Sequence, residues 1–238
     1  MRRSKMMIVL AAAVAIGATA CGSDRPDSQT SPATPPAKIK TVTAEALHVI
    51  PVYSLQDWVT YGDHLVEFTV AAERRLETDP TQVERGEGVV DRQVDVAFVD
   101  EPMWTRASLE NAPDTPRDFH LTNGGWSFHG DEEVPFMLVG QVWLTVGHRY
   151  VGLLTWTDID LVSGHAGQGP QWVMDATLPF DENVVGELGE MGEFTGYADV
   201  AGKPKGDLIT IFNQTPIEKA AAPYMELDPV LRTRKAHP

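Results

Sequence analysis

Apolar and polar residues alternate most clearly over residues 90–99. Successive side chains of an extended strand point to opposite faces. One face would carry Val90, Val94, Val96 and Phe98, and the other would carry Asp91, Gln93 and Asp95. The pattern predicts a strand with one face in a core, and it places Val94, Val96 and Phe98 in that core.

Further segments rich in β-branched and aromatic residues also predict strands. They are residues 64–76, 119–128, 134–144, 150–156 and 171–176. Glycines interrupt the apolar runs at Gly124-Gly125, Gly130 and Gly147, where turns would lie. Short strands separated by regular turns are typical of an antiparallel barrel or sandwich rather than of a parallel sheet.

Helix signals lie at the two ends of this β-rich stretch. Ser54 can cap a helix over residues 54–61, in which apolar residues recur at helical spacing. Residues 215–218, Thr-Pro-Ile-Glu, form a capping box and predict a second helix start. Asp228-Pro229 predicts another short turn, and residues 206–212 fit a strand or a helix. The predicted fold is mainly β, with short N-terminal and C-terminal helices, and an α+β fold is the alternative.

The first 40 residues follow a different pattern. Residues 6–16 are uninterruptedly apolar and follow Arg2, Arg3 and Lys5. This run is shorter than the roughly 20 residues that span a bilayer, so it predicts the apolar region of a signal peptide. Residues 24–40 contain four prolines among small polar residues, which predicts a semi-extended linker.

Cys21, the only cysteine, follows the small residues of a cleavage site. Residues 18–21, Ala-Thr-Ala-Cys, resemble the bacterial lipobox, although Ala18 stands where leucine is usual. The resemblance implies cleavage before Cys21, a diacylglycerol on its thiol, and a place on the extracytoplasmic face of the cell membrane. An ordinary cleaved signal peptide with an incidental cysteine is the alternative.

The expected organisation has four parts. Residues 1–20 are the signal peptide, 21–41 the lipidated cysteine and proline-rich linker, 42–200 a β-rich domain, and 201–238 a helical C-terminal appendage. Since the single cysteine would carry lipid, no disulfide can form within the chain, and stability must come from a packed core.

The mature chain would be strongly acidic. Removal of residues 1–20 takes three of the 19 basic residues and none of the 34 acidic ones, which changes the formal net charge from −15 to −18. Nucleic acid is therefore not an expected partner. Such a surface suits a basic partner, or it serves solubility alone.

A second resemblance concerns the domain itself. Residues 62–70, a β-pair ending near Trp104, and residues 146–154 resemble a pattern found in exported lipoproteins of high-GC Gram-positive bacteria. Those proteins are small OB-like barrels similar in shape to the tissue inhibitors of metalloproteases. The resemblance covers about residues 54–185 and implies an OB-like barrel or sandwich. The disulfide-forming N-terminal cysteine of the inhibitors is absent, so inhibition is not implied.

The histidines form no metal-binding motif in the sequence. They are His48, His64, His120, His129, His148, His165 and His237, and none forms a His-x-x-x-His pair. The first places for a metal site assembled in space would be Asp63-His64 and residues 129–133. The acidic run 131–133 lacks the alternating spacing of a calcium loop. No metal site and no cofactor is therefore predicted.

Nucleophile motifs are equally weak. Ser127, His129 and Asp131 would lie on one face of a strand through pleating alone, and no Gly-x-Ser-x-Gly elbow is present. The sequence therefore predicts no catalytic residue, and it favours a binding module over an enzyme.

Four tryptophans lie in or beside the predicted sheet: Trp126, Trp143, Trp156 and Trp172. They fill the core, or they stack on sugar rings of the envelope. The resulting expectation is a lipid-anchored binding or interaction module of the cell envelope, whose partner is an envelope protein or glycan. The alternatives are a glycan-binding module and a hydrolase with a spatially assembled histidine and carboxylate site.

Overall fold

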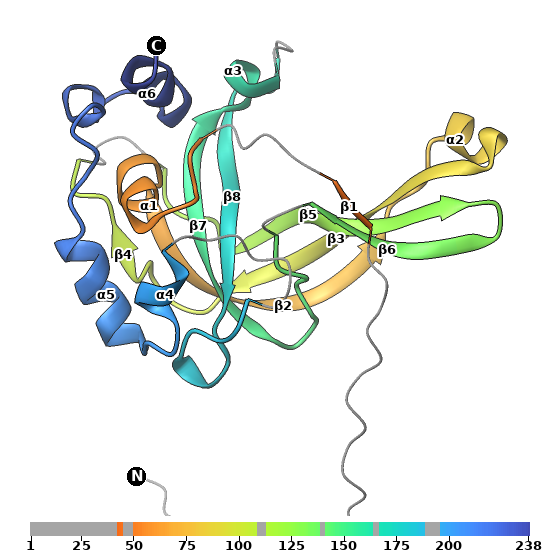
Figure 1. The fold of residues 1–238 in the computed structure, drawn as a ribbon, viewed down its shortest axis with the longest axis horizontal. Helices are drawn as coiled ribbons and strands as arrows, with labels where there is room; N and C mark the ends of the chain where they lie inside the picture. The colour runs from red at the N-terminus through yellow and green to blue at the C-terminus, as the bar shows by residue number, and fades with distance from the viewer. Residues whose placement is uncertain (1–41, 45–49, 109–112, 139–140, 164–166, 189–195) are drawn as a thin grey trace, which may run out of the picture. The chain divides into compact units, whose positions relative to one another are not determined.

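The computed structural model describes residues 42–44, 50–108, 113–138, 141–163, 167–188 and 196–238. Eight strands form one sheet in the order β1-β6-β5-β3-β2-β7-β8, and β4 also pairs with β2 (Figure 1). The strands are β1 (Val42–Ala44), β2 (His64–Arg75), β3 (Glu87–Phe98), β4 (Trp104–Thr105), β5 (Asp118–His129), β6 (Glu132–Leu138), β7 (Arg149–Asp158) and β8 (Pro170–Pro179). All neighbours pair antiparallel except β1 and β6.

The helices are short. They are α1 (Leu55–Tyr61), α2 (Pro80–Arg85), α3 (Ile159–Ser163), α4 (Tyr197–Val200), α5 (Lys205–Gln214) and α6 (Pro229–Ala236), with single 3₁₀ turns at Asp181–Asn183 and Ala222–Tyr224. Helices α1, α4, α5 and α6 gather at one end of the sheet, whereas α2 lies beside the far ends of β3 and β6 (Figure 1). The mainly β, antiparallel fold with short helices confirms the predicted fold class.

Two cores lie on opposite faces of the sheet because side chains of β2 and β7 alternate. Leu65, Val151 and Leu153 belong to the first core, which they share with the helices. Val66, Phe68 and Leu154 belong to the second core, on the other face. Each strand therefore buries both of its faces, which explains its nearly continuous apolar run.

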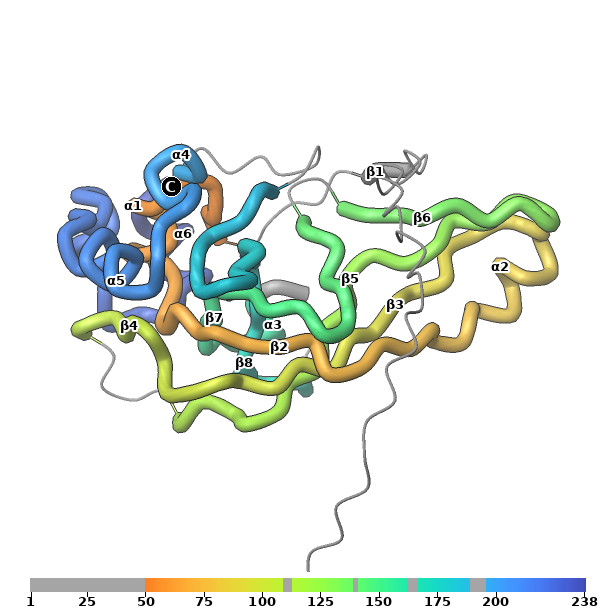
Figure 2. Tube along the Cα trace, turned by 90° about the horizontal axis from the view of Figure 1, so that it is seen from below, coloured from red at the N-terminus to blue at the C-terminus, as the bar shows by residue number. Residues whose placement is uncertain are grey.

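The sheet curls toward the second core. Phe119 on β5 and Trp172 on β8 both pack against this core, although β3, β2 and β7 separate their strands in the sheet. Figure 2 shows the sheet curved as a half-barrel with α1, α4, α5 and α6 at one end. The second core is thus the inside of the half-barrel.

Strand β3 follows the predicted alternation. Val94 and Val96 are buried, and Phe98 is half-buried against the second core. The same face also carries Arg92, whose side chain is fully buried, a feature that the alternation did not reveal. Its guanidinium donates to Glu73 and Asn123 and lies 4.3 Å from the ring centre of Trp143. A buried charge is tolerated there because these partners satisfy it.

Helix α1 forms as its cap predicts. Ser54 accepts a hydrogen bond from the Asp57 amide, and the Asp57 side chain accepts from the Ser54 amide in return. Leu55, Trp58 and Val59 are buried in the first core.

The predicted helix start at residues 215–218 is wrong. Thr215 instead ends α5, and its hydroxyl donates to the carbonyl of Ile211 at 2.8 Å. The Glu218 side chain accepts from the Tyr61 hydroxyl at 2.6 Å rather than closing a capping box. The two side chains of the expected capping box are therefore used elsewhere, Thr215 at the end of α5 and Glu218 in a contact with α1.

Residues 206–212, whose sequence fitted a strand or a helix, belong to helix α5. Its Leu208 and Phe212 are buried in the first core, where the Phe212 ring lies 6.0 Å from that of Trp58. Arg232 of α6 is fully buried and donates to the carbonyls of Thr60 and Leu227. The described residues from Val42 onward form one compact unit in which these helices share the core of the sheet.

The strand predicted for residues 134–144 is shorter than expected. Strand β6 ends at Leu138, and residues 141–144 form no strand. Val142 and Leu144 are nevertheless buried in the second core, and the Leu144 amide donates to the Asn123 side chain at 2.9 Å. The Asn123 side chain therefore forms hydrogen bonds with the backbone of residues 142 and 144, which a neighbouring strand would form in a regular sheet.

Candidate functional site

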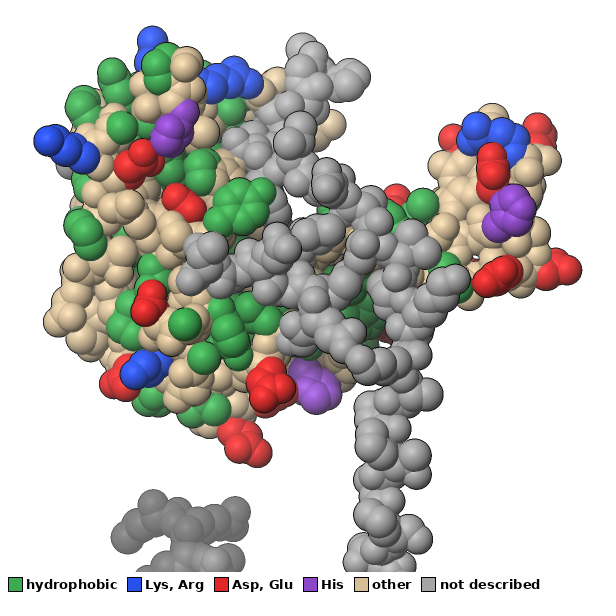
Figure 3. All heavy atoms as spheres, in the orientation of Figure 1, with side chains coloured by type: hydrophobic (Ala, Val, Ile, Leu, Met, Phe, Trp, Pro, Cys, Tyr) green, Lys and Arg blue, Asp and Glu red, His purple; other side chains and the backbone are tan. Residues whose placement is uncertain are grey.

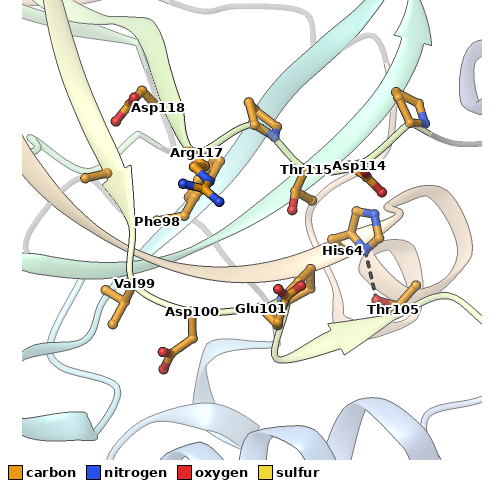
Figure 4. A pocket seen from close by; sticks show the side chains of 14 residues that line it. His64, Phe98, Val99, Asp100, Glu101, Thr105, Asp114, Thr115, Arg117 and Asp118 are labelled. Atoms are coloured by element: carbon orange, nitrogen blue, oxygen red, sulfur yellow. Dashed lines mark hydrogen bonds between the residues drawn. The ribbon is translucent and has the colours of Figure 1, made fainter.

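An open cleft of about 1000 Å³ lies at the end of the half-barrel where β3 ends and β5 begins. We call it the acidic cleft, because its lining includes the carboxylates Asp100, Glu101, Asp114 and Asp118 and a single guanidinium, Arg117. Figure 4 shows these side chains together with His64, Thr105 and Thr115, which also belong to the polar lining.

His64 is the buried polar group of the acidic cleft. Its side chain is 8 % exposed, and Nδ1 is hydrogen-bonded to Thr105 Oγ1 at 2.9 Å. The imidazole ring also lies 5.2 Å from the ring of Trp172. Burial lowers the pKa of His64 below its ordinary value, and this effect exceeds the opposing influence of Asp63. The imidazole is therefore neutral at pH 7.

Asp63 and His64 do not form the metal pair considered from the sequence. Adjacent residues at the start of β2 face opposite sides of the sheet, so His64 lies on the second-core face and Asp63 on the first-core face. The Asp63 carboxylate accepts from the Arg106 guanidinium at 2.8 Å and from the Trp156 amide at 2.7 Å. Asp63, which directly precedes β2, is thus half of a buried ion pair with Arg106, which directly follows β4, and it also binds the backbone of β7.

The charge of the acidic cleft is only partly compensated. Asp100 lies 3.6 Å from the Lys205 ammonium, which also contacts the buried Glu67 at 3.1 Å. Within the described part of the chain, no ion pair joins Glu101, Asp114 or Asp118 to a cation, and all three side chains are exposed. With His64 neutral, the cleft carries a negative potential that favours cationic groups.

The other candidate metal and triad positions lie apart from this cleft. His129 is 86 % exposed at the β5–β6 hairpin, beside Glu87 at 3.6 Å. The space-filling view shows acidic, basic and histidine side chains gathered over this hairpin and α2 (Figure 3). Among the described residues, no hydrogen bond links Ser127, His129 and Asp131, and no group of three metal-ligating side chains occurs.

The remaining histidines of the described ranges each pair with a carboxylate. His120 contacts Asp95 at 2.7 Å, His148 contacts Asp181 at 2.7 Å, and His237 contacts Glu218 at 3.2 Å. His48 and His165 lie outside the described residues. None of the three paired histidines lines the acidic cleft.

The four tryptophans considered from the sequence form two pairs. Trp126 and Trp143 have ring centres 6.0 Å apart, and Trp156 and Trp172 have ring centres 5.3 Å apart, both in edge-to-face geometry. All four are half-buried, so they are neither fully in the core nor fully on the surface. Arg75 covers Trp126 at 4.5 Å from its ring centre. Trp172 also lines a cavity.

This second cavity has a volume of about 280 Å³ and lies between β5 and β8. Asp175, which belongs to its lining, is the extra residue of a β-bulge, because Leu153 and Leu154 of β7 pair with Ala176 and Met174. Burial, and to a lesser degree the charge of Asp63, raises the pKa of Asp175 to about 6.

Replacing Asp175 by Asn is expected to stabilise the protein above pH 6 and to leave it unchanged below pH 4. Between these values the folded chain binds a proton that the unfolded chain does not, so the stability of the wild type falls as pH rises. A difference of about two pKa units corresponds to roughly 3 kcal/mol. Urea unfolding at pH 4, 5, 6 and 7 measures the difference in the free energy of unfolding between the variant and the wild type. Asp131→Asn, at an exposed carboxylate, should show no such pH dependence; equal curves for the two variants would contradict the prediction.

Sequence reasoning missed the acidic cleft. Residues 100–118 join two strands and are rich in proline and acidic residues, which is a sign of a functional loop between rigid elements. Cys21, the expected lipid site, lies outside the described residues. Within the described ranges, no helix is both long enough and apolar enough to cross a membrane.

Comparisons of the chain with protein-family models, with curated proteins and with solved structures yield no match.

Proposed function

We propose that this chain is a lipid-anchored binding module of the cell envelope, and that the acidic cleft takes a basic segment of an envelope protein. The observation that carries the proposal is the cleft itself. An open space of about 1000 Å³ presents four carboxylates against one guanidinium, beside a buried and neutral histidine. Concave sites with converging polar groups are the usual places of ligand binding.

The N-terminal segment supports the same function. A diacylglycerol on Cys21 would hold the chain at the membrane, and the proline-rich residues 24–40 would separate the domain from the lipid. A formal net charge of −15 for the whole chain, which becomes −18 after cleavage, would attract basic partners and speed their association.

A hydrolase is the second candidate, because the Thr105 hydroxyl contacts the neutral imidazole of His64 at 2.9 Å inside the cleft. A nucleophile–base pair usually needs a third group that orients the base. Among the described residues no hydrogen bond joins His64 to a carboxylate, so we rank binding above hydrolysis.

An oligolysine peptide tests the binding proposal. The purified mature protein should bind it, with affinity that falls steadily as salt is added, and should not bind an oligoglutamate peptide. Replacing Glu101, Asp114 and Asp118 together by their amides should weaken binding about tenfold or more, because each exposed pair contributes up to about 1 kcal/mol. Isothermal titration calorimetry measures both effects.

A second triple variant is the matched control. Glu84→Gln, Asp131→Asn and Glu132→Gln remove the same charge from exposed positions at α2 and the β5–β6 hairpin, which do not line the cleft. Equal weakening by the two triple variants would mean that net charge alone attracts the peptide, and the proposed site would be wrong.

A further inference from the structure

The cavity between β5 and β8 lies between two strand edges that face each other. Among the described strands, β8 is the last of the sheet and pairs with β7 alone. Strand β5 pairs with β3 from Asp118 to His129, whereas β6 pairs with its second half, residues 125–129. Within the described part of the chain, no strand pairs with the edge of residues 119–123 that faces away from β3. The half-barrel is therefore open along this line, which we call the open seam.

The lining of the open seam indicates that the backbone of both strands borders it. Residues 119–123 of β5 and 171–177 of β8 line it without a gap. Since the side chains of a strand alternate between its two faces, a cavity that touches every residue in turn lies along the edge of the strand. Every second residue of an antiparallel strand directs its N–H and C=O away from a given neighbour. The open seam therefore presents backbone donors and acceptors to a bound molecule.

The inner rim of the open seam is apolar. Four side chains of the rim are half-buried against the second core: Phe119, Leu121, Trp172 and Met174. On the other face of β5, His120 and Thr122 are exposed. An extended segment beside β5 would cover the apolar rim with every second side chain and leave the others in solvent. The seam therefore suits a strand of alternating apolar and polar residues.

The open seam adjoins the acidic cleft. Asp118, the first residue of β5, lines the cleft (Figure 4), and Phe119, the next residue, lines the seam. On the opposite side, the ring of His64 in the cleft lies 5.2 Å from the ring of Trp172 in the seam. A chain segment that leaves the cleft along β5 therefore enters the seam directly.

Charge and regularity favour β5 as the strand that pairs with such a segment. Within the described ranges, no lysine or arginine lines the seam, so no like charge repels a basic partner there. A bulge at Asp175 interrupts the edge of β8, and bulges hinder the addition of a strand. Residues 119–122 pair with β3 without a break and therefore offer a regular edge.

We propose that the basic segment bound in the acidic cleft continues into the open seam as an extended strand and pairs with the free edge of residues 119–123. The inference rests on the proposed function, because the cleft must hold the basic residues. It defines the partner more closely, as a run of basic residues joined to an alternating apolar and polar segment. Backbone hydrogen bonds supply affinity in such strand addition, and the apolar rim selects the alternating side chains.

Calorimetry with three kinds of peptide tests the proposal on the purified mature protein. Tetralysine fills the cleft alone, a second peptide joins it to Thr-Val-Thr-Val-Thr, and a third joins it to Ser-Gly-Ser-Gly-Ser. The alternating extension, placed before or after the lysines, should tighten binding about tenfold, because it adds backbone hydrogen bonds and covers the apolar rim. The Ser-Gly extension should bind as tetralysine does.

Backbone pairing is tested separately from side-chain contact. Methylation of peptide nitrogens removes N–H donors from one edge of the extension, at its threonines in one peptide and at its valines in another. At least one of the two methylated peptides should lose the gain in affinity. Hydrogen exchange followed by NMR should show the amides of residues 119–123 that point away from β3 exchanging rapidly in the free protein and slowly in the complex.

Leu121→Thr is the variant at the seam, and Thr122→Val, on the exposed face of β5, is its matched control. Leu121→Thr keeps a β-branched residue in the strand but removes apolar contact with the added segment, so most of the gain should be lost. Its affinity for tetralysine should not change, because Leu121 does not line the cleft. Thr122→Val should keep the full gain. Circular dichroism and the melting temperature verify that both variants fold.

The possible results separate this inference from the proposed function. Binding of tetralysine with equal affinity for both extended peptides, or with unchanged amide exchange at residues 119–123, would overturn the inference alone. Failure of tetralysine to bind would overturn both. Slow exchange of the outward amides in the free protein would mean that a second copy or another segment of this chain already fills the seam, which also rejects the inference, and analytical ultracentrifugation distinguishes these two cases.

Discussion

Val96→Asp is expected to unfold the domain. Val96 is 2 % exposed in the second core and lies between Val70 of β2 and Phe119 of β5 in the middle of the sheet. A carboxylate there would be buried without a partner, which costs several kcal/mol against the 5–15 kcal/mol that stabilise a typical domain. Circular dichroism and urea unfolding of the full chain in mild detergent should show a lost or strongly shifted transition.

Asp95→Asn is the matched control on the neighbouring residue. The Asp95 side chain is 32 % exposed on the opposite face of β3, where it contacts His120 at 2.7 Å. Asparagine keeps an oxygen acceptor, so the change should cost less than about 1 kcal/mol. Similar destabilisation by the two substitutions would show that the alternating faces of β3 do not separate core from solvent.

Cys21→Ala is expected to abolish the lipid anchoring of the protein completely. Since Cys21 is the only thiol in the chain, no other residue can take the diacylglycerol, and no disulfide is lost with it. The variant should accumulate as uncleaved precursor or be released into the medium. Cell fractionation, with mass spectrometry of the N-terminal peptide, distinguishes the two products.

Ser23→Ala, two residues further along the chain, is the control and should stay anchored and lipidated. A Cys21→Ala protein that is cleaved normally and remains in the membrane fraction would contradict the lipoprotein hypothesis. An uncleaved precursor could also stay in the membrane fraction through its apolar residues 6–16. It can be told apart from a cleaved protein, because it would be longer by the 20 residues of the signal peptide.

The local sequence pattern was sufficient to predict the structure where interactions between residues close in the chain decide it. The alternation over residues 90–99 predicted the buried face of β3, because the pleat of a strand fixes where each side chain points. Ser54 predicted the start of α1, because a capping box needs only residues three apart. The mainly β, antiparallel fold also followed from the spacing of strands and turns.

Similar local signals were misleading where distant partners compete for the same groups. The capping box at residues 215–218 satisfies the local rule, yet Tyr61 and Thr60 of α1 bind Glu218 instead. Asp63 and His64 are adjacent in the chain, but the sheet places a core on each side of β2 and separates them.

The sequence by itself determined the main strands of the sheet, the first helix and the acidic character of the chain. The curl of the sheet was decided only by tertiary structure, because the second core gathers side chains from β2, β3, β5, β7 and β8. That curl places His64 beside Trp172, and it brings Phe119 of β5 and Trp172 of β8 to the same cavity, from positions 53 residues apart in the chain. The burial of each polar side chain depends on all the strands that surround it, so it cannot be predicted from one segment of the sequence.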